Sequence, residues 1–137
     1  MQQEAVLAID PGREKCGIAV VHRTQGILYK AVVQTGELAA AAAALAAQYR
    51  LTTVIIGNST SSRAARKEIG VLTVQGEKLT MIPVDEYRST DQARKRYWAD
   101  HPPRGLKRLL PTGMQVPPVP VDDYAAVVLA ERYFAEK

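Results

Sequence analysis

The sequence predicts an α/β domain built on a mixed five-stranded sheet with helices on both faces. Three apolar segments at residues 5–10, 16–21 and 27–34 are separated only by short turns, which predicts a three-strand antiparallel meander. Two further apolar runs, 51–57 and 79–85, alternate with helical patterns, which is typical of α-linked parallel strands. With 137 residues, 47% of them hydrophobic, the chain is expected to be one globular domain covering 1–137.

The first strand ends abruptly in Asp10, followed by a Pro-Gly turn. A carboxylate at the end of a buried strand is partly desolvated and requires a partner of opposite charge or a metal ion. Asp before Pro-Gly is also ordinary turn chemistry. Taken alone, Asp10 fits both interpretations equally well.

An alanine-rich helix is expected after the meander, with Thr35 as its N-cap. Leu38, Leu45 and Tyr49 lie on one face of this helix by their spacing, which predicts that this face packs on the sheet. The Ser/Thr-rich run at 58–62 leads into a short helix that carries Arg63. Its hydroxyl groups either cap that helix or, together with Arg63, hold a phosphate.

The strand at 79–85 ends in Asp85-Glu86, and the residues at 89–91 are expected to cap a helix that runs to about residue 99. The last helix is expected to begin with Asp122-Asp123 and to run to about residue 136, with Asp122 as a natural N-cap. Glu86 is better interpreted as a functional group than as an exposed charge at the end of a strand. For Asp122, capping and metal binding are nearly equal in merit, and one Asp can do both.

Residues 101–121 contain six of the eight prolines and no clear helical or strand pattern. Loops of this length are uncommon in compact domains and are often functional. One hypothesis is a mobile flap that closes over an anionic substrate. The alternative is a static surface loop whose leucines fill a gap in the core.

The predicted topology brings the acidic residues to one edge of the sheet. Right-handed crossovers place the strand at 51–57 parallel to the first strand and beside it. Because the carboxyl ends of parallel strands meet at one edge, Asp10, the Asp85-Glu86 pair and the start of the last helix are expected to converge there.

Converging carboxylates without His or Cys form an oxygen-only ligand set, which favours Mg²⁺ or Mn²⁺. A pair of such ions roughly 3.5–4 Å apart is the arrangement that cleaves phosphodiester bonds. The acidic set therefore indicates a nuclease.

The charge distribution agrees with an anionic polymer as partner. The net charge is +4, and residues 88–108 alone carry seven basic and two acidic side chains, a net +5. A solvated helix face with a basic loop gives the same pattern. The residues expected to contact nucleic acid are Arg13, Lys15, Arg63, Arg88, Arg94, Arg104, Lys107 and Arg108.

Cysteine usage and hydropathy bear on location. The single cysteine, Cys16, fits a reducing cytosol and is expected to pack in the second strand. No apolar run approaches membrane-spanning length, and no secretory signal pattern precedes the first strand. We therefore expect a cytoplasmic protein.

Three motifs, in matching order and spacing over the whole chain, resemble the RuvC-like YqgF (RuvX) nuclease family, which has the ribonuclease H-like fold. The motifs are Ile9-Asp10-Pro11-Gly12 with Gly17-Ile18-Ala19-Val20, then Asp85-Glu86 before Ser89-Thr90, and Val121-Asp122-Asp123-Tyr124-Ala125-Ala126-Val127. The resemblance implies a metal-dependent endonuclease acting on branched DNA, as a Holliday junction resolvase does, or on precursor ribosomal RNA.

By motif position, the resemblance assigns metal binding to Asp10, Glu86 and Asp122. Tyr87 stands where the family usually has Arg, and Asp123 replaces a small polar residue, so either Asp122 or Asp123 can be the third ligand. RuvC-type enzymes cut paired strands as dimers, so the resemblance leaves open whether this chain forms a homodimer. The sequence itself shows no self-complementary apolar patch.

Two other function classes fit parts of the sequence. A non-catalytic nucleic-acid-binding module of the same fold would keep the basic segment but would gain nothing from carboxylates that face phosphates. An ATPase of the actin and hexokinase type would use the Asp-Pro-Gly turn as a phosphate loop, but it needs two domains around its nucleotide, and 137 residues form one. The sequence does not distinguish DNA from RNA as substrate.

Overall fold

The structure is a computed structural model that describes residues 4–59 and 62–136. The elements in chain order are β1 (Ala5–Asp10), β2 (Lys15–His22), β3 (Gly26–Gln34), the 3₁₀ turn η1 (Thr35–Glu37), α1 (Leu38–Tyr49), β4 (Thr53–Gly57), α2 (Ser62–Gly70), β5 (Thr73–Val74), β6 (Glu77–Lys78), β7 (Thr80–Val84), α3 (Ser89–Asp100), the 3₁₀ turns η2 (Gly105–Leu109) and η3 (Thr112–Met114), and α4 (Asp122–Ala135).

The main sheet has five strands in the order β3-β2-β1-β4-β7. The first three strands pair antiparallel as a meander, while β4 runs parallel to β1 and β7 runs parallel to β4. The predicted mixed sheet and the position of β4 beside β1 are therefore confirmed. The carboxyl ends of β1, β4 and β7 lie at the same edge.

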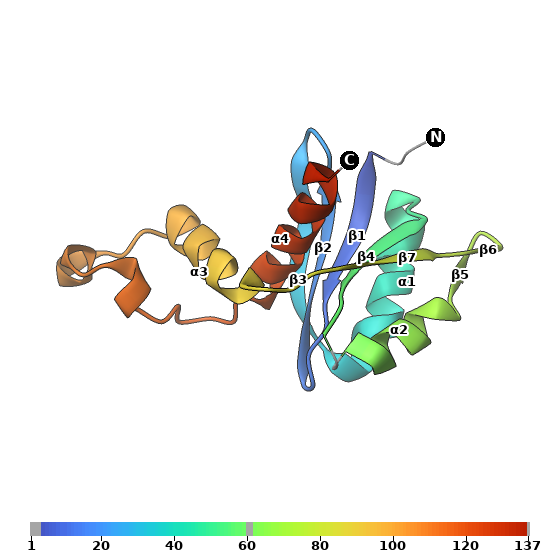
Figure 1. Ribbon diagram of the computed structural model, residues 1–137, viewed down its shortest axis with the longest axis horizontal. Coiled ribbons are helices and arrows are strands. Elements are labelled where there is room, and N and C mark those ends of the chain that lie inside the picture. The colour runs from blue at the N-terminus through green and yellow to red at the C-terminus, as the bar shows by residue number, and fades with distance from the viewer. Residues whose placement is uncertain (1–3, 60–61, 137) are drawn as a thin grey trace.

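Side chains of the central strands alternate between two apolar layers, so helices cover both faces of the sheet (Figure 1). On β1, Leu7 and Ile9 pack with the buried faces of α1 and α2. The intervening Val6 and Ala8 pack against α4. The predicted apolar face of α1 is confirmed, because Leu38 and Leu45 are buried and Tyr49 packs beside them.

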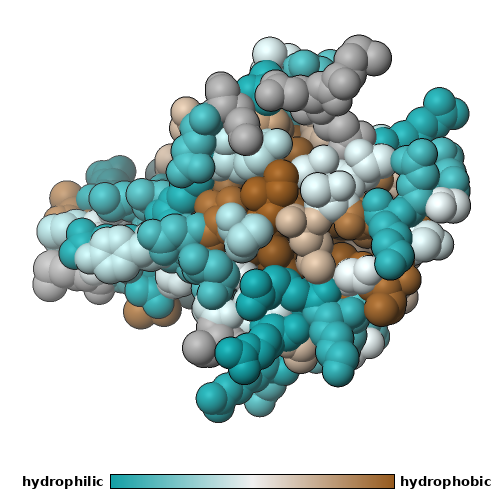
Figure 2. Space-filling model, turned by 45° about the vertical axis from the view of Figure 1, so that its right-hand side comes forward, coloured by the Kyte–Doolittle hydropathy of each residue, from teal (hydrophilic) through white to brown (hydrophobic). Residues whose placement is uncertain are grey.

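The end of α3 and the segment 101–121, which we call the proline-rich segment, extend away from the sheet (Figure 1). On the face seen in Figure 2, hydrophobic side chains gather in the centre and hydrophilic side chains surround them. Among the residues that the structure describes, no helix is both long and apolar enough to cross a membrane.

The expected helix caps are wrong at three sites. The Thr35 hydroxyl donates a hydrogen bond to the Gly12 carbonyl oxygen at 2.9 Å, and α1 begins only after the 3₁₀ turn. Ser89 is buried inside the first turn of α3, and Asp122 is the first residue of α4 after Val121 at the N-cap; neither helix has a side-chain cap. At Thr35, the tertiary partner Gly12 competes with capping for the side chain.

The hairpin β5–β6 was not predicted from the sequence. Its turn consists of Gln75 and Gly76, with φ of 54° and 83°, the left-handed pair that a two-residue hairpin requires. Gln-Gly is a weak signal for such a turn, and the strands are only two residues long. Thr60 and Ser61 of the predicted Ser/Thr run lie outside the described residues.

Candidate active site at the carboxyl edge of the sheet

Strand pairing brings the first two acidic motifs together. Asp10 is the last residue of β1 and lies opposite Gly17 of β2. Gly57 is the last residue of β4 and lies opposite Val84 of β7, two residues before Glu86. Because β1, β4 and β7 are neighbours and parallel, these ends form one continuous edge.

Asp10 has the most strongly perturbed acidity at this edge. Burial, followed by the negative charges of Glu86 and Asp122 and a hydrogen bond with Glu86, raises the pKa of Asp10 from 3.8 to about 7. Such a shift means that several carboxyl groups share a poorly solvated space. A perturbed carboxylate cluster of this kind is a common mark of a functional site.

Glu86 reaches this edge because Gly57 has no side chain. A Cβ at Gly57 would lie 1.8 Å from Glu86 Oε1, so the carboxylate occupies the space directly over the β4 terminus. Oε1 is buried and accepts no hydrogen bond. Asp85 is exposed instead, and its Oδ1 accepts a hydrogen bond from the Tyr87 amide at 3.0 Å. Of the two adjacent acids, Glu86 alone turns toward Asp10.

Asp122 is brought to the edge by a close contact between α4 and β2. A Cβ at Gly17 would lie 1.7 Å from the Asp122 carbonyl oxygen, so the first turn of α4 lies directly on the residue opposite Asp10. Burial and the neighbouring charge of Asp123 raise the pKa of Asp122, and the charge of Lys15 acts in the opposite direction.

Asp123 faces a different partner. Its Oδ2 accepts a hydrogen bond from Lys30 Nζ of β3 at 3.0 Å, and its Oδ1 accepts one from the Tyr124 amide at 2.9 Å. The Lys30 ammonium also lies 4.3 Å from the centre of the Tyr124 ring. Asp123 thus anchors α4 to β3, whereas Asp122 is the acid whose charge acts on Asp10.

Arg132 of α4 holds the loop that carries Glu86, and the sequence reasoning missed it. Its guanidinium donates hydrogen bonds to the carbonyl oxygens of Asp85 at 2.7 Å and Tyr87 at 2.6 Å, and to Gln92 Oε1 at 3.1 Å. The two carbonyl groups flank Glu86. Nothing in the local pattern around Arg132 signals this contact, because its partners lie forty or more residues away in sequence.

The basic residues predicted to bind nucleic acid occupy three areas. Lys15 is close enough to act on Asp122, and all eight are exposed. Arg13 lies in the β1–β2 turn and Arg63 in the first turn of α2, while the others lie along α3 and the proline-rich segment, namely Arg88, Arg94, Arg104, Lys107 and Arg108.

The alternative in which leucines of the proline-rich segment fill a gap in the core is wrong. Leu106, Leu109 and Leu110 are 84%, 74% and 51% exposed. The segment instead forms two 3₁₀ turns, Gly105–Leu109 and Thr112–Met114, on the outside of the molecule.

The residues at the edge fit a hard divalent cation. Their donors are carboxylate oxygens alone, and the buried Glu86 Oε1 lacks a hydrogen-bond donor. Burial, together with the charges of Glu86 and Asp122, raises the pKa of Asp10. In residues 4–59 and 62–136, no three or more Asp, Glu, His or Cys side chains are already arranged as a metal site.

Comparison with solved structures agrees with this architecture. A structure of Thermus thermophilus RuvC superposes with a TM-score of 0.60 at 19% identity, covering 96% of this chain and 94% of that one. The fold is that of RuvC. A second RuvC structure from T. thermophilus, in complex with a Holliday junction substrate, superposes with a TM-score of 0.57 at 16% identity over 98% of this chain and 96% of the other.

No protein-family model matches the sequence, and no curated protein matches it. At these identities, the likeness to RuvC establishes the fold alone. The narrower resemblance to the YqgF (RuvX) family, and the roles of individual residues, stay predictions.

Proposed function

We propose that the chain is a divalent-metal-dependent endonuclease that hydrolyses phosphodiester bonds in structured nucleic acid, and that it is a YqgF-type relative of RuvC. One observation carries the proposal. Two carboxylates from sequence-distant elements, Glu86 and Asp122, both act on the buried carboxyl group of Asp10 at one edge of a sheet with the RuvC fold.

The roles of the side chains follow from their surroundings. Asp10, in the middle of the cluster, and Glu86, with its free buried oxygen, would bind divalent cations, with Asp122 completing the set. Lys15 would attract a phosphate toward Asp122. Two bound Mg²⁺ or Mn²⁺ ions would supply an activated water and stabilise the negative charge on the leaving oxygen. Lys30 and Arg132 would hold α4 and the Glu86 loop in position.

Branched DNA is the favoured substrate because the second RuvC structure holds a Holliday junction. Precursor ribosomal RNA is the alternative that the family resemblance adds. A four-way junction has four strands, and its resolution takes paired cuts in two of them, which a homodimer would allow. The buried, unpaired Cys16 fits the reducing cytoplasm as the place of action.

The decisive experiment measures Mg²⁺-dependent cleavage of a four-way DNA junction, a linear duplex of the same sequence, a hairpin RNA and a ribosomal RNA precursor. Two matched pairs of variants accompany it. Glu86→Gln and Asp122→Asn should lose about 10³-fold or more in rate, because each removes a cation ligand. Asp85→Asn and Asp123→Asn, next to them in sequence, should each lose less than about tenfold.

Equal losses within each pair would contradict the assignment of residues. A wild-type protein that binds the junction but cuts none of the four substrates with Mg²⁺ or Mn²⁺ would support the non-catalytic binding module instead. Sedimentation with and without the junction measures whether two copies assemble on it.

A further inference from the structure

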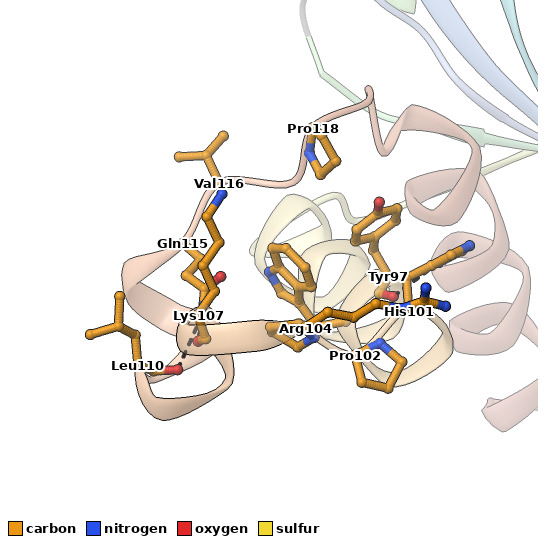
Figure 3. A pocket seen from close by; sticks show the side chains of 11 residues that line it. Tyr97, His101, Pro102, Arg104, Lys107, Leu110, Gln115, Val116 and Pro118 are labelled. Atoms are coloured by element: carbon orange, nitrogen blue, oxygen red, sulfur yellow. Dashed lines mark hydrogen bonds between the residues drawn. The ribbon is translucent and has the colours of Figure 1, made fainter.

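A cavity lies outside the carboxylate edge, between the end of α3 and the proline-rich segment. Its volume is 540 Å³, within the usual range for ligand sites. Figure 3 shows side chains from both stretches, among them Tyr97, His101, Arg104 and Lys107, around this space. The segment is closed at its far end by Gln115, whose side-chain amide donates hydrogen bonds to the carbonyl oxygens of Lys107 and Leu110.

The wall of the cavity is aromatic. Trp98 and His101 line it, and both contact Tyr97: Trp98 edge-on at 5.1 Å between ring centres, and His101 stacked at 4.5 Å. The Tyr97 ring also packs edge-on against Tyr124 of α4, which fixes the group to the body. The Trp98 Nε1–H is buried and has no hydrogen-bond acceptor.

The rim of the cavity is basic. Arg104 and Lys107 line it directly. A second cavity of 450 Å³ shares Trp98 with the first and is lined by Arg88, Arg94 and Lys95 against one acid, Asp91. This charge balance favours an anionic ligand.

The aromatic cavity is related to the carboxylate edge through residues that line neighbouring cavities. A third cavity, of 390 Å³, is lined by Arg94, Val116 and Asp122. Arg94 lines this cavity and the second, and Val116 lines all three. These shared residues place the three cavities in a series from Asp122 to Trp98, which we call the path.

We propose that this path binds a single-stranded stretch of nucleic acid, with an unpaired nucleobase in the cavity against Trp98 and its phosphate held by Arg104 and Lys107. Aromatic side chains within a basic groove are the usual means of binding unpaired nucleotides without sequence preference. A fully paired duplex cannot place a base there. This inference rests on the proposed function and adds to it that the substrate has unpaired nucleotides beside the cleavage site.

Trp98 is the only tryptophan of the chain, so tryptophan fluorescence reports on this cavity and on the second cavity, which Trp98 also lines. Metal-free wild-type protein is titrated with oligothymidylate, oligouridylate and a blunt DNA duplex of the same length, with binding followed in parallel by anisotropy of labelled strands. We expect the single strands to quench Trp98 and the duplex to leave it unchanged. The two single-stranded probes distinguish a DNA ligand from an RNA ligand.

Variants test the contacts. Trp98→Ala should weaken single-strand binding about 5- to 100-fold, Trp98→Phe should retain most of it, and duplex binding should not change. Lys107→Ala should weaken single-strand binding and lower its log–log salt slope by about 1. The matched control is Lys78→Ala, an exposed lysine of the β6 strand, which should behave as wild type.

Single strands that bind without changing Trp98 fluorescence would overturn the inference, as would equal quenching by the blunt duplex. A fluorescence change that depends on protein concentration alone would identify a second copy of the chain as the occupant and would also overturn it. Junction cleavage without quenching rejects this inference and leaves the proposed function intact. Quenching without cleavage rejects the proposed catalysis and leaves the binding site intact.

Discussion

The carboxylate edge and the proline-rich segment were both singled out by sequence, and they are built in opposite ways. At the edge, the side chains of Asp10, Glu86 and Asp122 are partly buried. Two glycines without side chains allow the main chain of Asp122 and the side chain of Glu86 to approach the sheet closely. In the segment, the cations and leucines are exposed, and the turns are closed by hydrogen bonds from Gln115. The difference teaches that like charges can be concentrated only where the main chain holds them rigidly, whereas dispersed cations need little support.

The first prediction, with the largest expected effect, uses pH on the metal-free protein. The pKa of Asp10 is about 7 in the folded state and 3.8 when unperturbed, so the folded state binds more protons between these values. Stability should therefore fall as pH rises from about 4 to about 7, by at most about 4 kcal/mol. Asp10→Asn should remove most of this dependence in denaturant titrations at several pH values. An unchanged pH dependence in the variant would mean that Asp10 is not the group responsible.

The second prediction compares the two glycines of the edge. Gly17→Ala should destabilise the protein by about 3 kcal/mol, because the new Cβ meets the main chain of Asp122 at the start of α4. Gly57→Ala should cost less than about 1 kcal/mol, because the Cβ meets the Glu86 side chain, which can turn away. Its cleavage rate should nevertheless fall at least about 100-fold, since Glu86 then leaves the site. Denaturation midpoints and cleavage rates measured together test both halves, and similar stabilities for the two variants would contradict this account.

The third prediction concerns Arg132 as a positioning residue. Arg132→Ala should lower kcat for cleavage about tenfold with little change in KM, because the Glu86 loop loses its hydrogen bonds to α4. Arg96→Ala is the matched control. It removes a partly exposed ion pair between Arg96 of α3 and Glu131 of α4 and leaves the hydrogen bonds of the Glu86 loop in place. If both variants reduced kcat equally, the contact between the helices rather than the loop would be responsible.

The smallest effect is expected in the proline-rich segment. Leu106→Ser and Leu109→Ser should each change stability by less than about 0.5 kcal/mol, because both side chains are mostly exposed. Leu129→Ala in α4, which is fully buried, should cost about 2–5 kcal/mol. A loss above about 1 kcal/mol for either serine variant, measured by denaturant titration, would show that the segment packs on the body through these leucines.

The fold was largely predictable because the apolar pattern is strong along each strand. The continuous apolar run of β1 and the apolar face of α1 carry their own signals, and crossover handedness then orders the strands. The hairpin β5–β6 could not be predicted, because its strands are two residues long and its turn lacks Asn-Gly or Asp-Gly.

The acids at the edge could be predicted as a group, but their individual orientations could not. Which of Asp122 and Asp123 faces Asp10 depends on Lys30, which lies 93 residues before Asp123. Gly57 and Glu86 are likewise related only through the pairing of β4 with β7. Such long-range partners leave no local trace in a single sequence, and the same holds for Arg132.

The position of α4 in chain order has a consequence during synthesis on the ribosome. This helix follows every strand, yet it covers the apolar layer that includes Val6, Ala8 and Ala19 and carries Asp122. A nascent chain that has completed β7 has therefore formed neither the third acid nor the cover of that layer. Until α4 emerges, this apolar surface stays uncovered, which makes the nascent chain a natural client for chaperones at that stage.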